Sequence, residues 1–239
     1  MQQALTEFWD LHIYQNFIAE DRWTYLVSGL QNTLIITFFS LLLGLTLGAL
    51  VAIVRVSHDK AGHPAAWLRV LNWICKVYLT VIRGTPVMIQ LLIMYFVIFG
   101  SVNINSVIVA CFAFGINSGA YVAETVRSGI MSIDPGQMEA GRSLGLPYST
   151  VMRTIILPQA IKNVLPALAN EFIALLKETS VSGYIGLRDL TRGGDIIRSQ
   201  TWDAFPPLMA VALIYLLLVL LIEKGIHVME RRLAQSDRG

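Results

Sequence analysis

The sequence contains few charged residues. Only 14% of its 239 residues are Asp, Glu, Lys or Arg, compared with roughly 25% in ordinary soluble domains. Hydrophobic residues make up 55% of the chain, and the mean hydropathy is +0.61. The formal net charge is only +2, so the composition gives no indication of a nucleic-acid partner. This combination is typical of a membrane protein.

Cysteine and histidine are also scarce. The two cysteines, Cys75 and Cys111, lie in apolar runs, where we expect them to pack as small hydrophobic residues rather than to form a disulfide framework. The four histidines are scattered, and His58 and His63 have no cysteine or acidic partners at ligand spacing. We therefore expect no metal site.

The chain lacks a phosphate-binding loop of the form Gly-x-x-x-x-Gly-Lys. We therefore expect it to bind no nucleotide and no other cofactor. Ser57, His58 and Asp59 are the residue types of a hydrolase triad, but adjacent side chains cannot point at one another. The predicted spans contain no histidine except His227, at an inner edge. The sequence thus predicts a protein that is not an enzyme.

Long uncharged runs predict membrane-spanning helices. Thirty-two uncharged residues separate Arg22 from Arg55, and forty separate Arg83 from Glu124. About twenty apolar residues cross a bilayer core, so the first run holds one span and the second holds most of two, with a turn at 100–105. Two further apolar segments follow. The fold class is therefore an all-α membrane protein with five spans, at 25–54, 70–99, 106–126, 164–187 and 204–227.

The distribution of basic residues predicts the orientation of these spans, because cytoplasmic loops carry an excess of Lys and Arg. With the N-terminus outside, the inner side holds eleven: Arg55, Lys60, Arg69, Arg127, Arg142, Arg153, Lys162, Lys224, Arg231, Arg232 and Arg238. The outer side then holds four: Arg22, Arg188, Arg192 and Arg198. This asymmetry predicts an N-out, C-in topology, which an odd number of spans also requires.

The N-terminal segment does not resemble a secretory signal peptide, because it is acidic before its first basic residue. Phe8, Leu11 and Ile18 share one helical face, so the segment either lies on the outer membrane surface or is an unstructured tail. The predicted divisions are an extracytoplasmic segment at 1–24, a transmembrane domain at 25–230 with a cytoplasmic coupling loop at about 127–163, and a cytoplasmic tail at 231–239.

A polar segment follows the third predicted span. Asp134, Pro135 and Gly136 favour a turn, residues 137–144 favour a short helix, and Gly145 is its expected stop. Such a segment is either a solvated loop helix or a docking surface for another protein.

Small residues favour the docking interpretation. Ala140 and Gly141 leave little side-chain bulk, so a partner backbone can approach closely, and Glu139 and Arg142 offer charged groups beside that gap.

Charged residues within the predicted spans suggest a polar pathway. Asn117, Tyr121 and Glu124 are spaced by four and three, so they share one helical face. Lys177 and Glu178 lie deep in the fourth span. A charged side chain near the bilayer centre costs at least about 2.5–3.5 kcal/mol on insertion scales, so it usually faces a cavity or a partner.

A proline in the second span suggests a broken helix. Pro86 follows Arg83, Gly84 and Thr85, and it removes one backbone donor. A broken helix of this kind can line a polar cavity. The charges of both signs in these spans suit an amino acid zwitterion, and the two acids favour a cationic or neutral substrate over an acidic one. The alternative is that the charges pair with one another and hold the helices together.

The polar segment resembles the cytoplasmic signature of permeases of ABC importers. The resemblance is carried by Glu139-Ala140-Gly141, then Gly145 after three residues, and Ile155-Ile156-Leu157-Pro158 after nine more. Gly141 stands where an alanine is more usual in the family. In a helix, glycine is about 1 kcal/mol less favourable than alanine.

Other motifs resemble the branch that imports polar amino acids such as histidine, glutamine and arginine, over roughly residues 25–230. In that branch an aspartate is commoner than the glutamate found at position 178. The motifs are Gly29-Leu30, Thr33-Leu34, Arg83-Gly84-Thr85-Pro86, Tyr121 with Glu124 and Arg127, Gly136-Gln137, and Lys177-Glu178-Thr179-Ser180.

This resemblance implies a type I importer permease in the bacterial inner membrane. Its partners would be an ABC ATPase subunit that binds ATP, a second permease copy or homologue, an extracytoplasmic substrate-binding protein, an amino acid and membrane lipid. The residues that would couple to the ATPase are Gly136, Gln137, Glu139, Ala140, Gly141, Arg142, Gly145, Leu157 and Pro158. The substrate-pathway candidates are Arg83, Gly84, Thr85, Pro86, Asn117, Tyr121, Glu124, Lys177, Glu178, Thr179 and Ser180.

An ion-coupled secondary amino acid transporter is the alternative function. Such proteins also bury charges, but they often have ten or more spans and internal repeats. The sequence shows neither feature.

Overall fold

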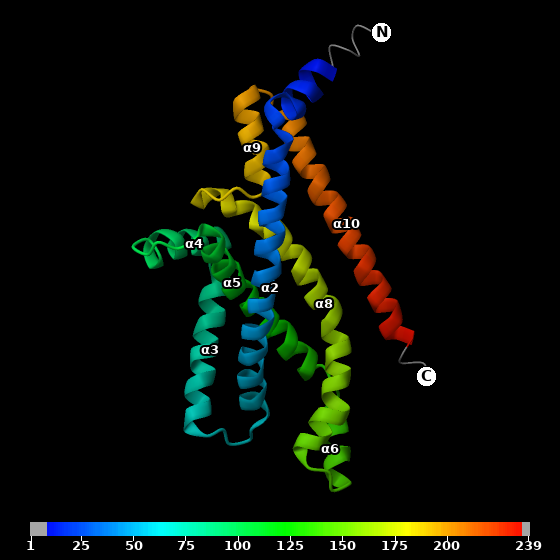
Figure 1. Cartoon of the computed structure of the whole chain (residues 1–239). Helices are drawn as coiled ribbons and strands as arrows, with labels where there is room; N and C mark the ends of the chain where they lie inside the picture. Colours follow the sequence, from blue (N-terminus) through cyan, green and yellow to red (C-terminus); the bar gives the residue numbers. More distant parts are fainter. Residues whose placement is uncertain (1–8, 236–239) are drawn as a thin grey trace. The chain divides into compact units, whose positions relative to one another are not determined.

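The computed structural model describes residues 9–235, in which helices are the only regular secondary structure (Figure 1). Their order is η1 (Trp9–Ile18), η2 (Ala19–Asp21), α2 (Trp23–Lys60), α3 (Ala66–Gly84), α4 (Val87–Ile93), η3 (Met94–Ile98), α5 (Ser106–Met131), α6 (Pro135–Ser143), α7 (Tyr148–Val151), η4 (Met152–Ile156), α8 (Leu157–Glu178), η5 (Thr179–Ile185), α9 (Leu190–Thr201) and α10 (Phe205–Gln235). The all-α prediction is confirmed for this part of the chain.

Within residues 9–235, three helices are long and apolar enough to cross a membrane: α2, α5 and the Phe205–Arg231 part of α10. A fourth span results if the broken pair formed by α3 and Val87–Ile98 counts as one. The predicted fourth span, 164–187, falls on α8 and η5, which are not among them. The number five and the orientation therefore remain predictions.

Two helices extend further than the sequence predicted. α2 continues to Lys60 and α5 to Met131, so Arg55 and Arg127 lie inside helices rather than in loops. Polar partners explain why these cations are tolerated there. Arg55 Nη1 donates to Asn72 Oδ1 at 3.1 Å, and Arg127 Nε donates to Asp59 Oδ2 at 2.9 Å.

The described chain divides into two compact units. Unit 1 comprises residues 9–39, 88–114 and 173–225, and unit 2 comprises 40–87, 115–172 and 226–235. The longest helices continue from one unit into the other, and each unit has its own packed core.

The core of unit 2 depends on close contact between α2 and α5. A Cβ built at Gly48 would lie 2.5 Å from Val122 Cγ1, and one built at Gly44 would lie 2.9 Å from Ser118 Oγ. Both distances are too short for any real side chain, so only glycine allows this approach. Small residues in this role are typical of helix pairs in membranes, where packing rather than water exclusion drives association.

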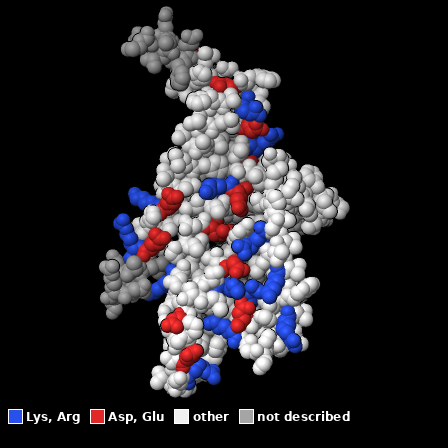
Figure 2. Space-filling view, turned by 180° about the vertical axis from the view of Figure 1, so that it is seen from behind, with Lys and Arg blue, Asp and Glu red and all other residues white. Residues whose placement is uncertain are grey.

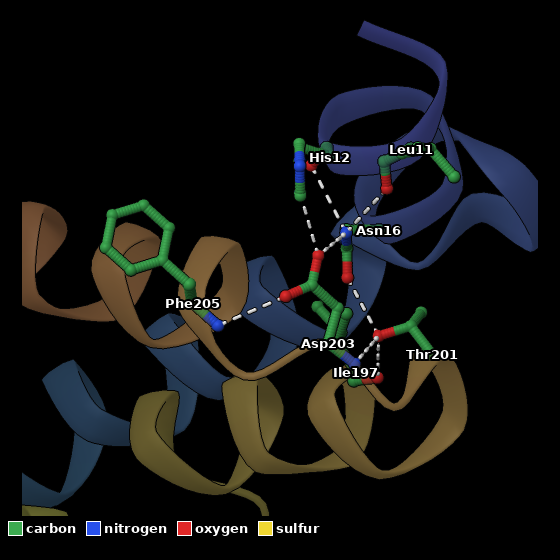
Figure 3. A network of polar contacts seen from close by, with 7 residues as sticks. All are labelled: Leu11, His12, Asn16, Ile197, Thr201, Asp203 and Phe205. Atoms are coloured by element: carbon green, nitrogen blue, oxygen red, sulfur yellow. Dashed lines mark hydrogen bonds and ion pairs between the residues drawn. The ribbon is translucent and has the colours of Figure 1, made fainter. Parts of the chain in front are cut away.

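The N-terminal segment is folded onto unit 1 (Figure 3). Asn16 on η1 is fully buried, and its Nδ2 donates to Asp203 Oδ2 at 3.2 Å. Thr201 Oγ1 donates to Asn16 Oδ1 at 2.8 Å, and His12 Nδ1 lies 3.0 Å from the same Asp203 oxygen. Because a buried amide requires such partners, this network fixes η1 against the turn between α9 and α10.

The expectation of an unstructured tail is therefore wrong for residues 9–21, which form η1 and η2. Leu11 and Ile18 are about half exposed, as a surface-lying helix requires. Phe8, the third member of the predicted face, lies outside the described residues, as do 236–239 of the predicted tail.

Candidate functional site

Three helices of unit 2 bring charged residues together at Glu124. Its Oε1 accepts a hydrogen bond from Arg127 Nη1 at 3.1 Å, and Arg83 Nη1 of α3 lies 3.9 Å from its Oε2. Asp59 of α2 accepts from the other side of the Arg127 guanidinium. The Arg83 guanidinium also lies 5.5 Å from the centre of the Tyr121 ring, as in a cation–π contact. Both carboxylate oxygens of Glu124 therefore face arginines.

These residues line two cavities of unit 2. The first, of about 590 Å³, is bounded by Arg55, Lys76 and Arg83 together with Tyr121 and Glu124. The second, of about 450 Å³, shares the last three of these residues and extends along α5 and α8. Concave sites with a few convergent polar groups are where small molecules usually bind. Arg83, Gly84, Tyr121 and Glu124, predicted as pathway residues, all line the first cavity.

The predicted break in the second span is confirmed. α3 ends at Gly84 and α4 begins at Val87, and Thr85 between them is extended, with φ −123° and ψ 146°. A residue before proline, here Pro86, favours this conformation. Thr85 Oγ1 donates to the Val81 carbonyl at 2.8 Å, so the hydroxyl satisfies one of the carbonyls at the end of α3.

Asn117, a further pathway candidate, is almost fully buried and lines neither cavity. Its neighbour Ser118 donates through Oγ to Glu171 Oε1 of α8 at 3.0 Å. Glu171 was not predicted as a site residue. The signal that could have identified it is an acid within an apolar segment.

The four remaining pathway candidates belong to unit 1. Lys177 and Glu178 form the end of α8, and Thr179 and Ser180 begin η5. Thr179 is fully buried, and its Oγ1 donates to the Leu176 carbonyl at 2.7 Å. Hydroxyl-to-backbone bonds of this kind compete with the α-helical pattern, which explains the tighter 3₁₀ turn that follows. The two charges therefore lie at the end of a helix rather than deep within one.

Two acids of unit 1 have shifted pKa values. Asp189 is fully buried and accepts from the backbone N–H groups of Thr191 and Arg192 at the start of α9. Burial raises its pKa to about 6, although those N–H bonds oppose the rise. Hydrogen bonds from Arg198 and then the nearby positive charge hold the pKa of Asp195 below its ordinary value.

On the face that Figure 2 presents, basic and acidic residues lie beside one another in small groups, separated by broad uncharged areas. Among residues 9–235, no group of three His, Cys, Asp or Glu side chains is placed to hold a metal ion.

The polar segment of unit 2 forms the short helix that its sequence predicts. α6 spans Pro135–Ser143, and Asp134 Oδ1 accepts from the Gly136 N–H at 2.8 Å at its start. Gly145 ends the helix with φ 82°, and the Leu146 N–H donates to the Gly141 carbonyl at 3.2 Å. This pair of features is a Schellman motif, in which glycine takes the left-handed position.

Gly141 faces the interior of unit 2 rather than a partner. It is buried, and a Cβ built there would lie 2.7 Å from Val151 Cγ2 of α7. The expectation that Ala140 and Gly141 together present a small-residue face is therefore wrong for Gly141, because Val151 already fills that space.

The exposed side of α6 carries other residues. Glu139, Ala140 and Arg142 are exposed, and Leu144 just beyond the helix is 82% exposed. Leu144 was not predicted from the sequence, because its exposure follows from the folded position of the end of α6.

Contacts with α8 hold α6 in place. Gln137 and Gln159 exchange two side-chain hydrogen bonds, at 2.6 and 3.1 Å. Leu157 packs against the core of unit 2 and begins α8, followed by Pro158. Since proline lacks an N–H and crowds the carbonyl four residues earlier, it accounts for the wider π-helical turn of η4 directly before it.

A family model described as "Binding-protein-dependent transport system inner membrane component" matches residues 61–235. The arginine transport system permease protein ArtQ of Bacillus subtilis is 37% identical over 215 residues, covering 89% of this chain and 94% of that protein. The L-cystine transport system permease protein TcyB of the same organism is 34% identical over 227 residues, covering 94% of this chain and 91% of that protein.

Solved structures of ABC transporters also superpose on this chain. A chain of an amino acid ABC transporter crystallised with histidines superposes with a TM-score of 0.80 at 41% identity, covering 90% of this chain and 98% of that one. A chain of an inward-facing MetNI methionine ABC transporter superposes with a TM-score of 0.74 at 22% identity, covering 90% and 99%. The second likeness concerns the fold alone.

Proposed function

Since the chain belongs to the family of binding-protein-dependent transport system inner membrane components, we propose that it is the permease subunit of an ATP-driven importer of polar amino acids. It is a multi-pass inner-membrane protein with the fold of a type I ABC importer permease. Its related permeases are transport components rather than catalysts, and ATP hydrolysis is assigned here to a partner chain that binds the nucleotide.

The observation that carries this proposal is the presentation of α6. The helix is fixed from behind by the Gln137–Gln159 pair and by the contact of Gly141 with Val151. It exposes Glu139 and Arg142, and Leu144 stands out beside them. A rigid polar helix with one projecting apolar side chain suits insertion into a groove of another protein. The protein that receives α6 in its groove is an ATPase subunit.

Substrate class rests on the relatives and on the cavities. The two permeases reported above are named for arginine and cystine, and the structure at 41% identity is of an amino acid transporter. All these substrates are zwitterions. The cavities of unit 2 are lined by polar and charged side chains, among them Arg83.

The proposed assembly follows from the predicted topology. Five spans with the N-terminus outside place α6 in the cytoplasm, where ATP is available. A second permease, identical or homologous, completes the pathway, and an extracytoplasmic binding protein delivers the substrate. ATP binding draws the two ATPases together, moves the two α6 helices, and changes the spans from inward- to outward-facing.

The test is a pair of substitutions at Leu144. Leu144→Asp places a charge where an apolar side chain is buried on docking, and we expect retention of the ATPase to fall about tenfold to a hundredfold, because burial of a leucine contributes roughly 1.5–3 kcal/mol. Leu144→Met keeps an apolar side chain of similar size and should retain the ATPase. The measurement is the amount of ATPase that co-purifies with the permease, together with ATP-dependent amino acid uptake.

Normal retention and uptake in the Leu144→Asp variant would contradict the coupling role. Amino acid uptake by the purified wild-type chain without any ATPase would contradict the proposed function itself. Gly141→Arg is a poorer test than the sequence suggests, because the added side chain collides with Val151 before it reaches a partner.

A further inference from the structure

The helix α3 has three distinct faces. Leu68 and Leu79 are buried and share one face with the half-buried Cys75. A second face exposes Trp67, Val70, Ile74, Val77 and Val81, which repeat at helical spacing and suit contact with lipid. The third face lies between them. It carries Arg69, Asn72, Lys76, Thr80 and Arg83.

The third face is a row of cations. Arg69, Lys76 and Arg83 are each seven residues apart, which is two helical turns, or about 10.5 Å along the axis. A row of this kind in a membrane helix is too costly to face lipid. Lys76 and Arg83 line the cavity of about 590 Å³, together with Arg55 of α2.

Glu124 and Asp59, two acids of this region, already pair with arginines. Both oxygens of Glu124 face Arg83 and Arg127, and Asp59 pairs with Arg127. Three cations and one carboxylate therefore line the first cavity, and that carboxylate, Glu124, also pairs with Arg127 outside the lining. Arg55 also has an unsatisfied donor, because its Nε is buried and has no hydrogen-bond partner among the described residues. A buried charged donor left unpaired is unfavourable, and an anionic group in the cavity would offset the positive charge of this guanidinium.

We propose that the cations of this cavity, Arg55, Lys76 and Arg83, bind the carboxylate of the transported amino acid. This inference rests on the proposed function and deepens it. The excess of positive charge repels a cationic side chain, so the preferred substrates have an uncharged or acidic side chain. Glu124 keeps the arginines in position and does not bind the substrate ammonium group.

The test measures direct binding to the purified permease–ATPase complex without the binding protein. The probes are tritiated glutamine, glutamate, histidine and arginine, each competed with the product of its decarboxylation: 4-aminobutanamide, 4-aminobutyrate, histamine and agmatine. The wild type should bind glutamine and glutamate more tightly than arginine. Glutamine should bind more tightly than 4-aminobutanamide, because only glutamine carries the recognised α-carboxylate. Absence of saturable binding of all four amino acids overturns the proposal.

Substitutions at Lys76 test whether the positive charge of its side chain, rather than its size, is needed for glutamine binding. Lys76→Gln should weaken glutamine binding about tenfold, as expected for the loss of one charged hydrogen bond, and leave 4-aminobutanamide binding unchanged. Lys76→Arg should restore glutamine binding. Lys224→Gln, an exposed cation on α10, is the matched control and should have no effect. Arg55→Gln provides an independent second variant with the same expected loss.

Three results would overturn the proposal. One is unchanged glutamine affinity in both the Lys76→Gln and Arg55→Gln variants. Another is a loss of assembly with the ATPase or the second permease in these variants, which would mean that the cations pair with a partner subunit. The third is a complete loss of glutamine binding in nanodiscs that contain phosphatidylglycerol, with binding retained in phosphatidylcholine alone, which would mean that anionic lipid headgroups occupy the cations in the membrane. In each case the proposed function still stands if the wild type shows ATP-dependent uptake.

Discussion

Two acids of unit 1 and two acids of unit 2 are held by different kinds of partner. In unit 1, Asp189 accepts from two backbone N–H groups of α9, and Asp203 accepts from the Asn16 amide and the Phe205 N–H, with His12 beside it. In unit 2, Glu124 and Asp59 pair with arginines that come from α3 and α5.

This difference separates two tasks. Acids held by backbone amides fix where helices begin and how the N-terminal segment attaches, so they act on the shape of unit 1. Acids held by arginines join three helices and balance only part of the positive charge of unit 2. The remaining charge is available to a ligand. Substitution of single acids can test this difference, because the effect on stability or on ligand binding should depend on the unit in which the acid lies.

The largest expected effect concerns Asp189. Its folded pKa of about 6 exceeds the ordinary value of 3.8, so between these values the folded protein keeps a proton that the unfolded chain loses. Stability should therefore fall as pH rises from about 4 to about 6, by up to about 3 kcal/mol. Asp189→Asn still accepts the capping bonds but cannot ionise, so its stability should not fall in this window.

Thermal unfolding of the detergent-purified protein between pH 4 and pH 7 measures this effect as the difference between wild type and variant. A pH dependence that is identical in both proteins would show that Asp189 does not carry it.

The second effect concerns Glu124. Glu124→Gln leaves Arg83 and Arg127 without their shared carboxylate, and we expect a loss of about 2 kcal/mol in stability, within the range for charged hydrogen bonds. Thermal stability and membrane abundance should fall together, and glutamine affinity should change less than stability. Glu223→Gln, at an exposed position on α10, is the control.

A well-folded Glu124→Gln variant of normal stability but much weaker substrate binding would contradict a structural role for Glu124. It would make Glu124 a direct ligand for the substrate ammonium group, and the comparison between the two units would no longer hold.

The smallest effect concerns Asp195, which pairs with arginines although it lies in unit 1. Arg192 and Arg198 lie three residues before and after it on α9, and all three side chains are exposed to solvent by about a third to a half. Exposed pairs of this kind contribute little. Asp195→Asn should lower the free energy of unfolding by less than about 0.5 kcal/mol, as measured by the unfolding midpoint, and leave uptake unchanged. A larger loss would show that arginine pairs matter equally in both units.

Local features of the fold were predictable from the sequence. The turn at Asp134, the stop at Gly145 and the break before Pro86 each depend on the backbone preferences of one or two residues, and the structure contains all three. The family signature added the proposed role of α6, which no local preference encodes.

Features that depend on contact between distant residues were not predictable. Gly141 was expected to face a partner, because its contact with Val151 requires α7 to fold back beside α6. Arg127 was counted as a loop cation, because its partner Asp59 lies on α2, far from it in the sequence. Lys76 was not considered, since a cavity lined from α2, α3 and α5 exists only after those helices pack.

The row of cations on α3 also constrains how the chain enters the membrane. On insertion scales each such residue costs about 2.5–3.5 kcal/mol at the centre of a helix, which offsets much of the apolar contribution of the remaining residues. We therefore expect α3 to insert poorly by itself and to leave the insertion machinery as a hairpin with α2, whose Arg55 bonds to Asn72 on the same face. Biogenesis of this protein then depends on pairing between successive helices, and a truncated chain that ends directly after α3 provides the shortest hairpin able to integrate.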